Sequence, residues 1–103
     1  MKTPIYRIRE KVWLYPAAHS MAGWHFVNVS KRASKEIKEL FDRERRGFGS
    51  VRVKATVGKT AWNTSVFPDK KPGGYILPLK ADVRREEDIR AGEMLHYSIE
   101  IIV

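Results

Sequence analysis

The amino-acid sequence predicts a mainly β protein: a small split β-barrel of about six or seven strands, capped by one α-helix. The strongest support is a hairpin. Val51 to Val57 alternates apolar and polar residues, Gly58-Lys59 supplies a two-residue turn, and Thr60 to Phe67 returns as a second strand.

Two further observations support a barrel. Ser34 to Arg45 is the only segment with the spacing of a good helix, which disfavours a doubly wound parallel sheet. Trp24 to Val57 and Tyr75 to Val103 both run from a strand, through a helix or turn and a glycine, to an alternating strand. This similarity predicts a pseudo-two-fold internal repeat within a single domain spanning residues 1–103.

The first half of the chain contains two predicted strands and the helix. Tyr6 to Tyr15 alternates as a strand, with Glu10 interrupting its apolar face, which indicates a bulge or an edge position. Trp24 to Val29 carries apolar residues on both faces, so we expect both faces to be covered. The helix is expected to bury a face made of Ala33, Ile37, Leu40, Phe41 and Glu44. Its N-cap is predicted at Ser34, with Ser30 as the alternative.

After the hairpin, Tyr75 to Val83 alternates as a strand that Pro78 breaks or confines to an edge. Arg84 to Glu93 is predicted to form no more than a helical turn, anchored by Ile89 and stopped by Gly92. Met94 to Val103 then closes the chain as a strand.

Composition limits the classes of function. The chain has 103 residues, a net charge of +8 and 43% hydrophobic residues, which suits a folded domain with a core. There are no cysteines, so disulfides and thiolate chemistry are excluded. No apolar run approaches the roughly 20 residues that span a bilayer, and we expect a cytoplasmic protein without a membrane partner. The positive charge favours nucleic acid or another polyanion as partner.

Several short motifs are better explained by structure than by chemistry. Gly58-Lys59-Thr60 lacks the upstream glycine and following helix of a phosphate loop, so a hairpin turn is expected. Gly47-Phe48-Gly49 follows a helix, the reverse of a dinucleotide fingerprint. Three scattered histidines have no metal-ligand spacing, and Thr64-Ser65 has no evident base. We therefore predict no metal, no cofactor and no catalytic residue, and favour a non-enzymatic module.

Several stretches resemble a prokaryotic family, the domain of unknown function 1905. They are W-H-F-V at Trp24 to Val27, R-R-G-F-G-S-V at Arg45 to Val51, W-N-T-S-V-F-P-D-K at Trp62 to Lys70, Y-I-L-P-L-K-A-D-V-R at Tyr75 to Arg84, and Gly92-Glu93. The family usually has proline where this chain has Ser30 and aspartate where it has Glu93. The resemblance implies a double-split β-barrel, similar to AbrB-like and MazE-like DNA-binding domains but formed by one chain. It implies no catalytic residues.

Two sets of residues are candidate binding sites. The candidate polyanion-binding residues are Arg43, Arg45, Arg46, Arg52, Lys54, Lys59, Lys70 and Lys71. The candidate pocket residues are Trp24, Phe26, Trp62, Thr64 and Phe67, because aromatic side chains at a barrel end can bind a small molecule or stack bases. A binding module for nucleic acid or another polyanion is the first hypothesis. A small-molecule or enzymatic pocket and a protein-interaction module are the alternatives, for a monomer or weak homodimer.

Overall fold

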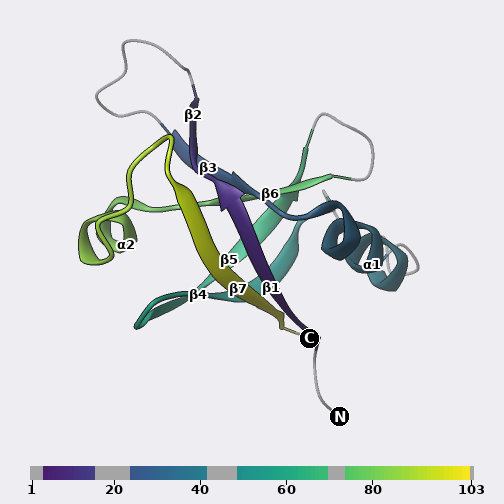
Figure 1. Ribbon diagram of the computed structural model, residues 1–103. Helices are drawn as coiled ribbons and strands as arrows, with labels where there is room; N and C mark the ends of the chain where they lie inside the picture. Colours follow the sequence, from purple (N-terminus) through teal and green to yellow (C-terminus); the bar gives the residue numbers. More distant parts are fainter. Residues whose placement is uncertain (1–3, 16–23, 42–48, 70–73, 103) are drawn as a thin grey trace.

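A computed structural model describes residues 4–15, 24–41, 49–69 and 74–102, with the Phe41 side chain excepted. Their strands form one antiparallel sheet in the order β1-β7-β4-β5-β6-β3-β2, curled into a half-barrel (Figure 1). The strands are β1 (Ile5–Lys11), β2 (Trp13–Tyr15), β3 (Trp24–Asn28), β4 (Val51–Val57), β5 (Thr60–Pro68), β6 (Tyr75–Pro78) and β7 (Met94–Ile101). The helices α1 (Lys31–Phe41) and α2 (Ala81–Glu86) lie at opposite ends of the molecule, to the right and left in Figure 1. The predicted split barrel is therefore confirmed, with a second, short helix.

The core fills the concave side of the sheet. In β4, Val53 and Ala55 are fully buried, while the alternating Arg52 and Lys54 are exposed, as the predicted hairpin requires. Gly58 has a φ of 56° and begins the two-residue turn into β5. A glycine with positive φ at the first turn position is typical of a type II′ turn. Tyr97, Ile99 and Ile101 of β7 are buried beside this hairpin.

The strand pairing agrees with the predicted internal repeat, because corresponding strands of the two halves pair with each other. The Val29 N–H donates to the Tyr75 carbonyl and the Leu79 N–H donates to the His25 carbonyl, which extends the β3–β6 ladder at both ends. β3 pairs antiparallel with β6, and β4 with β7. The two units are β1-β2-β3-α1-β4 and β5-β6-α2-β7. The first strand of each unit pairs with the last strand of the other: β1 with β7, and β5 with β4.

Glu10 lies on the edge strand β1, the second of the two alternatives predicted for it. The predicted strand divides after it, at buried Val12, whose backbone bonds to Gly92 and Glu93. Two other expectations for the strands were wrong. β3 is not covered on both faces, because Trp24 is 65% exposed. The strand predicted from Tyr75 to Val83 ends at Pro78, where a break was one of the predicted alternatives. The helix α2 begins at Ala81, and its residue Val83 packs into the core. Ile89 is buried, as the anchoring role predicts.

The helix α1 begins three residues earlier than the first prediction. Ser30 is the N-cap, since its Oγ accepts a hydrogen bond from the Ala33 N–H at 3.3 Å. Ser34 instead lies inside the helix, where it is buried and donates to the Val29 carbonyl. Ala33 and Ile37 are buried as predicted, but Leu40 is 51% exposed. Glu44 and the predicted helix end lie outside the described residues.

Candidate binding surfaces

The convex face of β1, β7, β4 and β5 carries five exposed cationic side chains. Directly paired residues of neighbouring strands project to the same face. The pairs Arg7–Ser98, Ser98–Thr56 and Lys54–Glu100 therefore place the polar residues of β1, β7 and β4 together. The five exposed cations are Arg7, Arg9 and Lys11 of β1 and Arg52 and Lys54 of β4. We call these five residues the cationic set.

A shallow hollow of about 380 Å³ lies on this face. It is lined by Arg7, Ile8, Arg9, Thr56, Gly58, His96, Tyr97 and Ser98. Within the described part of these four strands, Glu100 is the one carboxylate on the convex face. The hollow thus combines guanidinium groups with hydroxyl and imidazole groups, which are suitable hydrogen-bond partners for an anion.

The predicted polyanion residues are only partly within the described chain. Arg52 and Lys54 share the convex face, and Lys59 is exposed in the turn that follows β4. Arg43, Arg45, Arg46, Lys70 and Lys71 lie outside the described residues, so one continuous patch remains a prediction. Arg7, Arg9 and Lys11 were not in the predicted set. Their alternation was visible in the sequence. The β1-β7-β4 strand order, which places them on the same face as the β4 cations with β7 between, was not.

The convex face of β2, β3 and β6 is aromatic. Trp13 pairs with Phe26 and Phe26 with Pro78, while Tyr15 pairs with Trp24. Phe67 joins the same face by pairing with Ile76, whose neighbour on β3 is Asn28. Trp24, Tyr15 and Phe67 are 65%, 57% and 44% exposed, and Trp13 and Phe26 are half-buried. We call Trp13, Tyr15, Trp24, Phe26 and Phe67 the aromatic face.

The central rings of this aromatic face are held in place by their neighbours. Trp13 Nε1 donates a hydrogen bond of 2.8 Å to Asn28 Oδ1. The Trp13 and Phe26 ring centroids lie 4.9 Å apart, and Trp24 stacks nearly parallel to Phe26 at 6.4 Å. Such ring contacts are favourable beyond area burial. The Trp24 ring is therefore supported from within the sheet while most of its surface faces solvent.

The five residues of the predicted pocket divide between the two faces of the sheet. Trp24, Phe26 and Phe67 lie on the convex aromatic face. Trp62 and Thr64 pair with the fully buried Ala55 and Val53 and project to the concave side, where Trp62 packs against the core. A ligand site at these residues remains a prediction.

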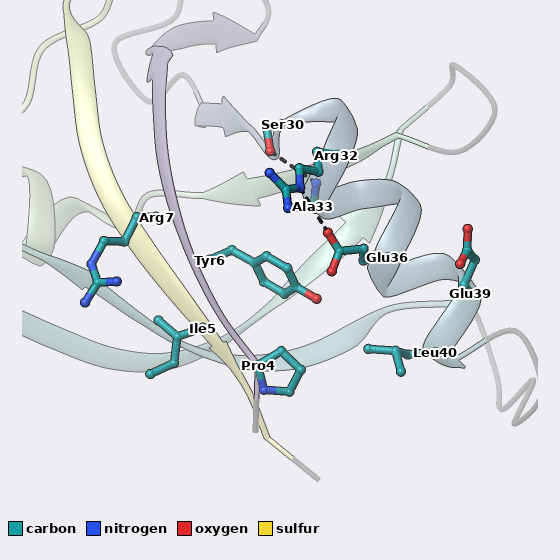
Figure 2. A pocket seen from close by; sticks show the side chains of 10 residues that line it. All are labelled: Pro4, Ile5, Tyr6, Arg7, Ser30, Arg32, Ala33, Glu36, Glu39 and Leu40. Carbon is teal, nitrogen blue, oxygen red and sulfur yellow. Dashed lines mark hydrogen bonds and ion pairs between the residues drawn. The ribbon is translucent and has the colours of Figure 1, made fainter. Parts of the chain in front are cut away.

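A separate cleft of about 870 Å³ lies between the start of β1 and α1 (Figure 2). It is lined by Pro4, Ile5, Tyr6, Arg7, Ser30, Arg32, Ala33, Glu36, Glu39 and Leu40. The Tyr6 ring projects from β1 toward the helix, and Arg32 and Glu36 form an ion pair of 3.5 Å above it. Burial, followed by the charge and hydrogen bonding of Glu36, raises the pKa of Tyr6 above its ordinary value. No pattern in the sequence indicates this cleft, because it exists only where β1 meets α1.

The Gly58-Lys59-Thr60 motif has the hairpin structure expected of it, whereas Gly47 and Phe48 lie outside the described residues. Gly58-Lys59-Thr60 joins two strands, and half-buried His25 lies on β3 with its backbone carbonyl bonded to Leu79. Among the described residues, no group of three histidine, aspartate or glutamate side chains is arranged to hold a metal ion. The helices in the described ranges include none that is long and apolar enough to cross a membrane.

The curled sheet, its two short helices and its exposed convex faces define a small β domain of split-barrel form. The chain belongs to the family described as Domain of unknown function (DUF1905), whose model matches residues 10–99. The predicted family is thereby confirmed. None of the curated proteins compared with the chain matches it.

Proposed function

We propose that this domain is a non-enzymatic binding module that takes nucleic acid or another polyanion on the convex face bearing the cationic set. The observation that carries the proposal is the strand register, which places three cations of β1 and two of β4 on one face of the sheet, where Glu100 is the one carboxylate of the described strands. The net charge of +8 adds a long-range attraction for polyanions. The similarity to DNA-binding split barrels agrees with the proposal as an analogy of fold.

The test is fluorescence anisotropy with a labelled oligonucleotide at several salt concentrations. Binding should weaken steeply with salt, because each phosphate contact adds about 0.7 to 0.9 to the slope of log affinity against log salt. The double variant Arg52→Glu/Lys54→Glu should bind about tenfold more weakly or worse, with a slope lower by about two.

The matched control is Lys35→Glu/Lys38→Glu, which makes the same charge change on exposed positions of α1. It should keep most of the affinity. An equal loss in both double variants would indicate attraction to net charge alone and overturn the assignment to the convex face. No binding at about 50 mM salt would overturn the proposed function itself.

A second candidate function is small-molecule binding in the cleft between β1 and α1. Its volume of about 870 Å³ and its mixture of apolar and charged lining favour it. A ligand seated there should raise the thermal unfolding midpoint of the wild type. The Tyr6→Phe variant should reduce this rise, because it removes the one phenolic hydroxyl that projects into the cleft.

A further inference from the structure

We infer that the aromatic face stacks the bases of a single-stranded nucleic acid whose phosphates lie on the cationic set. This inference rests on the proposed function and narrows it to one class of ligand. Unpaired bases offer flat apolar surfaces, and nonspecific single-strand binders combine stacking aromatic rings with a positively charged track. Base pairs in a duplex bury those surfaces and leave no face for Trp24 to stack on.

The first argument is that every second residue from Arg7 to Tyr15 projects to the convex side, first three cations and then two aromatic residues. Arg7, Arg9 and Lys11 are exposed, Val12 is buried, and Trp13 and Tyr15 again project to the convex side. Alternate residues of a strand lie about 6.6 Å apart. A nucleic-acid strand whose phosphates follow β1 would thus place its next bases beside the rings of β2 and β3.

The second argument is a separate junction between β4 and β5 on the same convex face. Arg52 pairs with Ser65, and Phe67 lies two residues further along β5 on the same face. A diagonal neighbour of this kind lies within reach of a long side chain. Cationic and aromatic groups therefore adjoin both at β1–β2 and at β4–β5, as a ligand carrying phosphates and bases requires.

The third argument concerns order. Trp24 rests on Phe26, which rests on Trp13, and Trp13 is fixed by its hydrogen bond to Asn28. A ring that is already oriented loses little conformational freedom on binding, so more of the stacking energy appears as affinity. An exposed tryptophan held in this way is a suitable platform for a base.

The experiment compares three labelled probes of equal charge: a single-stranded oligonucleotide, a shorter duplex, and inorganic polyphosphate, which has no bases. The wild type should prefer the single strand, and its tryptophan fluorescence should be quenched on binding. Trp24→Ala should weaken single-strand binding about tenfold and leave polyphosphate binding unchanged. Phe67→Ala should act in the same direction. Ile102→Ala, which changes an exposed apolar residue outside the aromatic face, is the control.

The outcomes separate this inference from the proposed function. Equal affinity for single strand, duplex and polyphosphate, with no effect of Trp24→Ala, would overturn base stacking and leave polyanion binding in place. No binding of any probe at about 50 mM salt would overturn both. A loss in Trp24→Ala that is equal for polyphosphate and single strand would also overturn stacking, and circular dichroism of the variant shows whether misfolding is its cause.

Discussion

At the scale of single residues, Asn28 links the convex and concave sides of the sheet. Its side-chain Oδ1 fixes Trp13 on the aromatic face. Its backbone carbonyl accepts a hydrogen bond from the hydroxyl of Tyr97, which is only 4% exposed. A buried hydroxyl needs such a partner, because an unsatisfied polar group in the core is costly. The candidate base-stacking surface and the core thus share one residue.

Tyr97 leads to a prediction about alkaline pH. Burial, and next the charge of Glu10, raises the pKa of Tyr97 far above its ordinary value of 10.0. The folded state keeps a proton that the unfolded chain releases above about pH 10. The stability from this group is complete below about pH 10 and falls by up to about 1.4 kcal/mol per pH unit above it. Urea denaturation across this range measures the decline.

Tyr97→Phe is the informative comparison for that pH dependence. It is expected to be less stable near neutral pH by about 1 kcal/mol, because the hydrogen bond to Asn28 is lost. Its decline above about pH 10 should be shallower by the contribution of one proton. Parallel declines in the two proteins would show that Tyr97 does not retain its proton in the folded state.

At the scale of elements, the β4–β5 hairpin and the end of α2 depend on each other. Thr60 Oγ1 donates a hydrogen bond of 2.6 Å to Glu87 Oε2, just after the helix. The other Glu87 oxygen lies where a Cβ on Gly58 would be, at 2.2 Å. The positive φ therefore favours glycine at this position, and a Cβ there would also displace the Glu87 carboxylate that accepts from Thr60.

Gly58→Ala should lower the free energy of unfolding by about 1–3 kcal/mol, because the left-handed backbone and the contact with Glu87 both oppose a side chain. Lys59→Ala, one residue later in the same turn, is the control and should change stability by less than about 0.5 kcal/mol. Chemical denaturation of both variants measures the difference. If Glu87→Ala restored the whole loss in the Gly58→Ala background, the cost would come from crowding and not from φ.

At the scale of the whole molecule, the exchanged strands make the two halves interdependent. β5 opens the second unit but pairs with β4 of the first, and β1 opens the first unit but pairs with β7 of the second. Neither unit can complete its part of the core alone, because the buried residues of β4 and β7 lie side by side on the concave face of the sheet. Such an arrangement favours all-or-none unfolding.

We expect a single cooperative unfolding transition in urea. Far-ultraviolet circular dichroism reports the whole sheet. Tryptophan fluorescence reports Trp13 and Trp24 on one part of the sheet and Trp62 on the other. The two curves should have the same midpoint, and Trp24→Phe should leave that midpoint agreement intact. Two separated transitions would show that the units unfold independently and contradict this account of the exchange.

Among the candidate sites, the sequence identified individual residues better than their grouping. It singled out Arg52 and Lys54 as outward cations and Trp24 and Phe67 as candidate pocket residues. It also placed Trp62 and Thr64 with Phe67, although residues of opposite parity on β5 project to opposite faces. The β1 cations were not among the predicted binding residues, and the strand order that places them on the same face as the β4 cations is not visible in the sequence. The cleft beside Tyr6 had no sequence signal.

The local features of this protein follow from the sequence alone, since alternation, turn residues and the internal similarity depend on neighbours along the chain. They predict the β4–β5 hairpin, the Gly58 turn and the two similar halves. The fold as a whole selects Ser30 as the N-cap of α1, replaces part of a predicted strand by α2, and brings cationic and aromatic residues to the convex face of the sheet. Those features depend on burial and on pairing between distant strands, which cost loop-closure entropy and are selected by the core as a whole.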